Sequence, residues 1–317
     1  MYVLFAIGFV ILIKGADLLV AGASSIAGRF NISSLVIGLT VVAFGTSTPE
    51  LFVNLIASFN GNTEIAIGNV LGSNIANVLL ILGVAALIYP LSVQSSTIWK
   101  EIPFSFLAAI VLGVLANDIL IDGALKSELS RSDGMILICF FSIFMVYVFE
   151  ISFRHKDEKS EDTVKVMGVF KSVLFILLGL TGLVFGGKWI VDGAIVIATN
   201  MGISESLIGL TVVAVGTSLP ELATSAVAAY RRNVDIAIGN IVGSNIFNIF
   251  LVLGISAMIK PLPFRATSNS DIYMVILSSL LLFVFLSIGK RHMLMRWQGL
   301  VFLLLYIGYT VMLVIKG

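Results

Sequence analysis

Two glutamates, Glu50 and Glu221, are the residues of this sequence best suited to chemistry, because each lies inside a long apolar segment. A carboxylate at that depth in a membrane costs at least ~2.5–3.5 kcal/mol on insertion scales unless its charge is compensated. Each glutamate follows a proline, in GTSTPE at residues 45–50 and in GTSLPE at residues 216–221. Proline removes an amide donor and displaces the carbonyl about one turn earlier. Freed backbone oxygens are tolerated at membrane depth only beside a cavity or a ligand, so both motifs predict a polar site.

The positive partner of these glutamates is not obvious in the chain itself. Two lysines also lie within apolar segments, but Lys14 precedes Asp17 by three residues and Lys188 precedes Asp192 by four. Side chains at these spacings are neighbours on a helix surface, which favours local ion pairs over a direct role in the site. The simplest remaining counter-charge for the glutamates is a bound cation.

Oxygen-bearing residues near the glutamates match what hard cations require. Ca²⁺ takes about 6–8 oxygen ligands from carboxylates, carbonyls and waters, and two carboxylates with two interrupted helices supply such a shell. Side chains spaced by four share one helix face, and their neutral oxygens suit Na⁺. The ligands expected from this reasoning are Glu50, Glu221, Ser73, Asn77, Ser244 and Asn248.

A purely structural interpretation exists for each of these motifs. The prolines would then mark helix kinks whose hydroxyl neighbours bond to backbone carbonyls. The asparagines would join neighbouring helices, which glycines allow to approach closely. Two kinks with paired glutamates favour the cation site over kinks alone. For four asparagines, Asn69, Asn74, Asn240 and Asn245, both interpretations stay open.

The composition identifies an integral membrane protein. Of 317 residues, 58% are hydrophobic and 12% are charged, with a mean hydropathy of +1.09. Average soluble chains have about 45–50% apolar and about 25% charged residues, so a cytosolic enzyme is excluded. The net charge of +1 gives no case for nucleic-acid binding. We expect the lipid bilayer as the chain's environment and no obligate protein partner.

The apolar residues fall into ten segments, each near the roughly 20 residues that a spanning helix needs. The expected spans cover residues 2–28, 35–59, 65–89, 102–121, 135–153, 172–199, 207–230, 236–259, 272–288 and 299–314.

The sequences of the two halves align when residue 37 is placed on residue 208. Residues 37–50 then match residues 208–221 at twelve of fourteen positions, and residues 65–77 match 236–248 at ten of thirteen without a gap. Each copy contains five spans, and because five is odd the second copy must enter the membrane from the opposite face. We therefore expect an all-α membrane protein of ten transmembrane helices in two inverted five-helix repeats. The boundaries are 1–153 for the first repeat, 154–171 for a linker and 172–317 for the second repeat.

The positive charges orient this arrangement. Twelve Lys and Arg side chains fall in one set of alternate loops and five in the other. Positive side chains are retained on the cytoplasmic side, so the linker is expected in the cytoplasm and both termini outside a cell membrane. Two antiparallel copies of one packing can open a central site to each side in turn, which predicts a transporter that works by alternating access.

The paired GTS-x-PE and GN-x-x-GSN motifs closely resemble the two alpha repeats of the cation/calcium exchanger superfamily, in its sodium/calcium exchanger branch and of the compact prokaryotic type. The resemblance covers almost the whole chain. It implies an antiporter without enzymatic activity or cofactor that exchanges Na⁺ for Ca²⁺, with Ca²⁺ extruded, and it implies that Glu50 and Glu221 bind the two ions alternately. Relatives, including the potassium-dependent branch, have aspartate where this chain has Asn248, which argues against potassium dependence. The further ligands that it implies are Thr46, Ser47, Thr217, Ser218, Ser73, Ser244 and the backbone carbonyls of Ala43 and Ala214.

Two other transport functions stay open as alternatives. In a proton-coupled calcium antiporter the glutamates would alternate between Ca²⁺ and H⁺, although serine and asparagine ligands would serve protons poorly. A cation channel would need a continuous pore and no counter-ion. Four acids gather around one outward loop, either as a solvated face or as a surface that attracts cations: Asp118, Asp122, Glu128 and Asp133.

Overall fold

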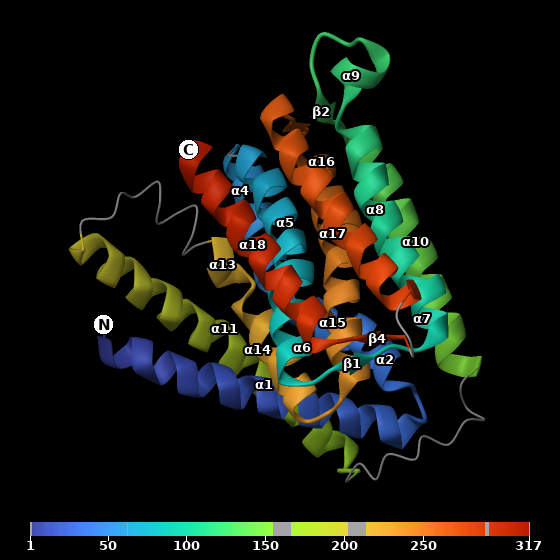
Figure 1. Ribbon diagram of the computed structural model, residues 1–317, viewed down its shortest axis with the longest axis vertical. Coiled ribbons are helices and arrows are strands. Elements are labelled where there is room, and N and C mark those ends of the chain that lie inside the picture. Colours follow the sequence, from blue (N-terminus) through green and yellow to red (C-terminus); the bar gives the residue numbers. More distant parts are fainter. Residues whose placement is uncertain (1, 62, 155–165, 202–213, 289–291, 317) are drawn as a thin grey trace.

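The structure is a computed structural model that describes residues 2–61, 63–154, 166–201, 214–288 and 292–316. Nearly all of these residues are helical, as the apolar composition requires of a chain that must satisfy its backbone groups within a bilayer (Figure 1). The elements of the first half are α1 (Tyr2–Phe30), α2 (Ser34–Ile37), the π-helical η1 (Gly38–Val42), α3 (Ala43–Thr46), α4 (Thr48–Asn60), α5 (Thr63–Ile75), the π-helical η2 (Ala76–Leu82), α6 (Gly83–Ile88), β1 (Leu91–Ser92), α7 (Ser95–Trp99), α8 (Glu101–Leu115), α9 (Asp118–Asp122), β2 (Glu128–Leu129) and α10 (Arg131–Arg154).

The second half repeats much of this order. Its described elements are α11 (Val169–Asn200), α13 (Ala214–Thr217), α14 (Leu219–Tyr230), α15 (Val234–Ile246), the π-helical η5 (Phe247–Leu253), α16 (Gly254–Ile259), β3 (Leu262–Pro263), the 3₁₀-helical η6 (Ala266–Ser268), α17 (Asn269–Ile288), β4 (Met293–Leu294) and α18 (Arg296–Lys316).

Nine of the ten predicted spans have a counterpart among the described helices. Eight helical stretches are long and apolar enough to cross a membrane, and residues 34–60 add a ninth that is bent by 44° between α3 and α4. The seventh predicted span, 207–230, lies partly outside the described residues, and its remainder forms α13 and α14. The described chain is thus an all-helical membrane fold with up to nine visible spans.

The two prolines interrupt their helices as the sequence predicts. Pro49 lies in the first turn of α4, and Ser47 separates α4 from α3 with a non-helical backbone. Pro220 lies in the first turn of α14, and Ser218 separates α14 from α13 in the same way. Proline is accepted in a first turn because that amide has no intrahelical acceptor. Each glutamate therefore lies in the first turn of a helix that follows a break.

The duplication visible in the sequence is also visible in the structure. The π-helical segments η2 and η5 begin at equivalent positions of the two copies, Ala76 and Phe247. β1 pairs antiparallel with β4 and β2 pairs antiparallel with β3, so each half contributes one strand to each pair. Because β1 and β3 also begin at equivalent positions, the same contact occurs twice with the two halves exchanged.

Helices α1 and α11 pack directly against each other and lie obliquely to the remaining bundle (Figure 1). Their contact is built on glycines. A Cβ at Gly8 would lie 3.0 Å from the carbonyl oxygen of Gly186, and one at Gly15 would lie 2.8 Å from that of Gly179. The residue numbers rise along α1 as they fall along α11, so the two helices run antiparallel.

The centre of the molecule is formed by the two spans that carry the asparagines. The continuous helical stretches Ala66–Ile88 and Val234–Ile259 are the most deeply buried of the eight straight spans. The bent span packs on the second of them, where Gly239 lies against Gly38 and Gly243 against Leu39. The polar helix faces are therefore enclosed by protein, as buried polar groups in a membrane require.

Candidate functional site

The structure brings the two glutamates to one place. The exposed fraction is 0% for Glu50 and 1% for Glu221, and each lies in the first turn of its helix, α4 or α14. The Ser47 hydroxyl, at the break before α4, donates a 3.0 Å hydrogen bond to Oε1 of Glu221. Ser47 lies three residues before Glu50, so this bond brings the two glutamates to the same pair of helix breaks. Residues far apart in the sequence thus form one acidic centre at the two helix breaks.

Many of the oxygens predicted to bind ions have no hydrogen-bond partner among the described residues. Both carboxylate oxygens of Glu50 and Oε2 of Glu221 are in this state. A buried polar atom without a partner costs about 1–3 kcal/mol, so such a cluster is typical of a site that binds a ligand. The other unpartnered oxygens at the predicted positions are Ser73 Oγ, Asn77 Oδ1, Ser218 Oγ, Ser244 Oγ and Asn248 Oδ1.

Asparagine amides from the two halves hold each other in place. Asn77 donates to Asn245 Oδ1 at 2.9 Å, and Asn248 donates to Asn74 Oδ1 at 3.1 Å. The two bonds are equivalent when the halves are superposed. Each uses the amide nitrogen of the predicted ligand and leaves that ligand's own oxygen available for another partner.

The threonines of the two motifs bond to asparagines of the opposite half. Thr46 donates to Asn240 Oδ1 at 3.0 Å, and Thr217 donates to Asn69 Oδ1 at 3.5 Å. Asn240 in turn donates to Ser225 at 3.0 Å. These contacts support the interhelical interpretation for Asn69 and Asn240, and Asn74 and Asn245 join the two halves as described above.

The backbone carbonyl of Ala43 already accepts two hydrogen bonds. They come from the amide of Ser47 at 2.9 Å and from the hydroxyl of Thr46 at 3.3 Å. Its equivalent, Ala214, is the first residue of α13, and the residues before it lie outside the described part of the chain.

Two buried polar residues on α4 were not among the sequence predictions. Asn54 and Ser58 are 0% and 1% exposed, and Asn54 Nδ2 and Ser58 Oγ lack a partner among the described residues. With Glu50 they form a series spaced by four, so they share one face of α4. That spacing is visible in the sequence and would have found them. In α14, Thr224 Oγ1 is likewise buried and unpartnered.

The predicted local ion pair of Lys14 with Asp17 was wrong. Asp17 instead pairs with Arg231, which follows the end of α14. The side chains of Lys14 and Lys188 are exposed, whereas both glutamates are buried. The pairing is decided by the packing of α1 on α14, which residue spacing within α1 cannot reveal.

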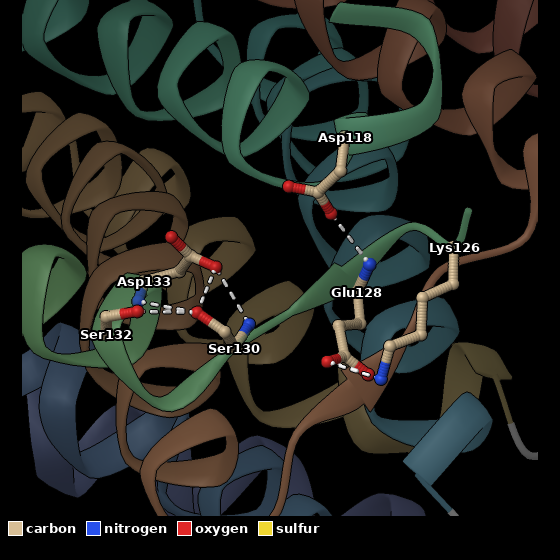
Figure 2. Close-up of polar contacts among 6 residues, drawn as sticks. All are labelled: Asp118, Lys126, Glu128, Ser130, Ser132 and Asp133. Atoms are coloured by element: carbon tan, nitrogen blue, oxygen red, sulfur yellow. Dashed lines mark hydrogen bonds and ion pairs between the residues drawn. The ribbon is translucent and has the colours of Figure 1, made fainter. Parts of the chain in front are cut away.

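The acids of the loop before α10 form hydrogen bonds and an ion pair within that loop (Figure 2). Asp118 accepts a 2.9 Å hydrogen bond from the amide of Glu128, and the Glu128 carboxylate pairs with Lys126 at 2.9 Å. Asp133 accepts from the amide of Ser130 at 2.8 Å, while Ser130 Oγ accepts from the amide of Asp133 at 3.3 Å. This reciprocal pair is a helix N-terminal capping box, and these contacts support a solvated face with structural bonds.

Comparison with known proteins gives one consistent result. The family model for the sodium/calcium exchanger protein matches residues 1–150 and 171–315. The sodium/calcium exchanger MaX1 of Methanosarcina acetivorans is 34% identical, over 98% of both chains. A putative antiporter, CaxA of Alkalimonas amylolytica, is 38% identical over 97% of this chain and 96% of its own length. A solved structure of the sodium-calcium exchanger NCX_Mj matches with a TM-score of 0.82 and 35% identity, over 98% of this chain and 97% of that chain.

Proposed function

The chain belongs to the sodium/calcium exchanger family, and we propose that it exchanges Na⁺ for Ca²⁺ across a cell membrane as a secondary active antiporter. The observation that carries this proposal is the buried pair Glu50 and Glu221, of whose four carboxylate oxygens three lack a partner among the described residues. Buried charges are normally paired or coordinate metals. Na⁺ and Ca²⁺, the ions in the family's name, are assigned here as the substrates.

We infer that the ions bind where both halves contribute oxygens. The two carboxylates and the unpartnered serine and asparagine oxygens supply the about 6–8 hard ligands that Ca²⁺ favours, and the neutral oxygens suit Na⁺. The hydroxyls and carbonyls at the helix breaks complete the set. The proposed ligand residues are Glu50, Glu221, Thr46, Ser47, Thr217, Ser218, Ser73, Asn77, Ser244, Asn248, Ala43 and Ala214.

The coupling of Na⁺ transport to Ca²⁺ transport follows from competition of the two ions for one site and from a barrier to the movement of the empty site. Two carboxylates balance the charge of one Ca²⁺ or of two Na⁺, so one kind of ion displaces the other. A loaded site can change the face to which it opens, while an empty site with two negative charges is costly to carry through the membrane interior. A Na⁺ gradient directed into the cell therefore drives Ca²⁺ out.

The proposed architecture is ten transmembrane helices in two inverted repeats, residues 1–153 and 172–317, joined by a cytoplasmic linker at 154–171. It is supported by the antiparallel contact of α1 with α11 and by the asparagine bonds that recur with the halves exchanged. Such repeats allow alternating access. The excess of Lys and Arg in the linker's set of loops supports termini on the extracytoplasmic side.

Transport in proteoliposomes tests the proposal. We expect ⁴⁵Ca²⁺ uptake to require an opposing Na⁺ gradient, and we expect Glu50→Gln and Glu221→Gln each to abolish it, because each removes one of the two charges that hold Ca²⁺. Glu128→Gln is the matched control, since that acid pairs with Lys126 outside the site, and it should transport normally.

The same assay separates the alternatives. Uptake that follows a pH gradient instead of a Na⁺ gradient would identify a proton-coupled antiporter. Uptake that needs no counter-ion would identify a channel. Full uptake in both glutamine variants would reject the assignment of the site.

A further inference from the structure

Thr46 bonds differently from other helical threonines of this chain. The ordinary acceptor for a threonine hydroxyl within a helix is the carbonyl four residues earlier. Four threonines follow that pattern, with bonds of 2.6, 2.7, 2.8 and 2.9 Å: Thr40, Thr48, Thr181 and Thr310. The Thr46 hydroxyl crosses to the other half of the chain and donates to Asn240 Oδ1 at 3.0 Å, which is nearer than its second acceptor, the Ala43 carbonyl at 3.3 Å. This bond therefore needs an explanation other than helix geometry.

The packing of α15 on the bent span puts Asn240 within reach of Thr46. A Cβ at Gly243 of α15 would lie 2.7 Å from the Cβ of Ala43, the first residue of α3. Glycines allow helix backbones to approach this closely in a membrane. Asn240 precedes Gly243 by three residues and so lies on the same face of α15. Its side chain is 0% exposed and contacts the last residue of α3 directly.

A third residue fixes the orientation of the Asn240 amide. The amide nitrogen donates to Ser225 Oγ at 3.0 Å, so the amide oxygen, the only acceptor of this side chain, is the atom that faces Thr46. Ser225 is 0% exposed and lies four residues after Glu221 on α14. This series of bonds joins the helix break of one half to the helix that carries the glutamate of the other half.

The next hydroxyl along the chain shows what the bond to Asn240 prevents. Ser47 carries the same group as Thr46, but its hydroxyl donates to Oε1 of Glu221 at 3.0 Å. A hydroxyl has one proton and two lone pairs and rotates to suit its partners, and a carboxylate is a stronger acceptor than a neutral oxygen. Because Asn240 takes the Thr46 proton, the lone pairs of the Thr46 oxygen remain available to a cation.

The other half repeats this order of partners. Thr217 donates to Asn69 Oδ1 at 3.5 Å, and Asn69 Nδ2 donates to Asn54 Oδ1 at 3.5 Å. Asn54 lies four residues after Glu50, at the position equivalent to Ser225. Both contacts are longer than their counterparts at 3.0 Å. The arrangement thus occurs twice with the halves exchanged, and it is tighter at Thr46.

We propose that Asn240 is a positioning residue of the ion site, which turns the Thr46 hydroxyl so that its oxygen faces Na⁺. This inference rests on the proposed function and adds to it a residue that acts on the ion only through Thr46. Hard cations are bound through the lone pairs of oxygen ligands, so a hydroxyl whose proton is already donated elsewhere is prepared for the ion. Asn69 has the same role toward Thr217, through longer contacts.

A cycle of two substitutions in the purified full chain separates this role from the joining of helices. The measurement is the Na⁺ concentration that displaces half of the bound ⁴⁵Ca²⁺, with ⁴⁵Ca²⁺ set at its own Kd in each variant. We expect Thr46→Val and Asn240→Leu each to raise this concentration about threefold to tenfold, because each removes the same prepared ligand. The double variant should raise it no further. Effects that multiply in the double variant, or an unchanged value in Asn240→Leu, would overturn the proposal.

Two further variants guard against a general folding defect. Asn117→Leu removes another amide contact between the halves, the reciprocal pair of Asn117 and Asn269 at 2.8 and 2.9 Å, and should leave the Na⁺ concentration unchanged. A rise equal to that of Asn240→Leu would overturn the proposal, because lost helix joining would then suffice. Ser225→Ala frees the Asn240 amide and should raise the concentration only while Thr46 has its hydroxyl. Equal effects of Ser225→Ala with and without Thr46→Val would also overturn the proposal.

Failure of the proposed function itself gives a different result. The unmodified chain would then show neither displacement of ⁴⁵Ca²⁺ by Na⁺ nor Na⁺-driven uptake, and the role of Asn240 would be rejected with it. Displacement that is normal in the unmodified chain, together with effects that multiply in the double variant, would reject the positioning role alone.

Discussion

At the residue scale, the two glutamates occupy equivalent positions but have different partners. Glu221 Oε1 accepts from Ser47, whereas neither oxygen of Glu50 has a partner among the described residues. Beyond Glu50, the buried polar groups of Asn54 and Ser58 continue along one face of α4. At the position equivalent to Ser58 the second half has Ala229, which is buried. A polar series thus leads away from Glu50 along α4, toward the end where Gly61 lies near Lys260.

We predict that Asn54 forms part of an ion path on the face of the membrane toward which α4 runs. Asn54→Leu should raise the KM for Na⁺ and Ca²⁺ at that face about tenfold, because it replaces a buried amide worth about 1–1.5 kcal/mol to a passing ion with an apolar wall. The KM for either ion at the opposite face, the one proposed to carry the linker at 154–171, should change less than twofold. The measurement is flux in proteoliposomes with the ion varied on one side at a time.

The matched control for Asn54 is Ile56→Ala, a substitution on the exposed side of the same helix, where Ile56 is 59% exposed. It should leave both KM values unchanged. An equal rise at both faces in Asn54→Leu would mean that Asn54 belongs to the central site and to no one-sided path.

At the element scale, the close approach of α1 and α11 depends on residues without a side chain. Glycines recur at Gly8, Gly15 and Gly22 on α1, and a Cβ at Gly22 would lie 2.7 Å from the carbonyl oxygen of Ser172. Small residues at helix contacts in membranes allow the backbones to approach and gain van der Waals contact. The pair therefore packs as one unit across the bundle (Figure 1).

We predict that Gly15→Ala and Gly179→Ala each lower the thermal unfolding midpoint. Overpacking of this kind costs about 1–3 kcal/mol, which for a chain of this size corresponds to roughly 1–5 °C. The measurement is a thermal melt of the detergent-solubilised protein. Gly308→Ala is the control, because a Cβ there meets nothing within 4 Å among the described residues. A melting point for Gly15→Ala equal to that of the control would contradict the proposed contact.

At the scale of the whole molecule, the hydrogen bond from Ser47 to Glu221 departs from the exchange symmetry of the site. Most contacts occur twice, as in the Asn77–Asn245 and Asn248–Asn74 pairs. The bond from Ser47 to Glu221 does not, because Ser218 Oγ lacks a partner among the described residues. If the halves exchange conformations when the site opens to the other face, Ser218 should then donate to Glu50 and Ser47 should release Glu221.

We predict that Ser47→Ala and Ser218→Ala shift the balance of the two states in opposite directions. A hydrogen bond to a charged group contributes about 1.5 kcal/mol or more, so each change should alter the ratio of the Na⁺ KM values at the two faces by about tenfold. One-sided flux measurements give this ratio. The double variant should restore the original ratio, and shifts in the same direction for both single variants would reject the exchange of bonds.

The sequence predicted nine of the spans that the described helices contain and the helix breaks before both glutamates, while the set of ion ligands stays a prediction. The break at Ser47 and the burial of Glu50 were both predicted and are both observed. Asn54 was not among the predicted site residues, because only the prolines and the repeated motifs single out residues of α4. Its spacing of four residues from Glu50 would have indicated it. The partner of Asp17 could not be found in this way, because Arg231 follows a helix in the other half of the chain.

The sequence by itself determined that this chain is a membrane protein, that its two halves are copies of one unit, and that two acids follow helix breaks. Hydropathy, repetition and proline are local properties, so their consequences can be read along the chain. Only the tertiary structure decided that the amide nitrogen of Asn77 donates to Asn245, while its amide oxygen has no hydrogen-bond partner among the described residues. The contact of the buried Glu101 with Tyr147 is another such pairing. Such pairings depend on how distant helices pack, and no local pattern in the sequence records which faces meet.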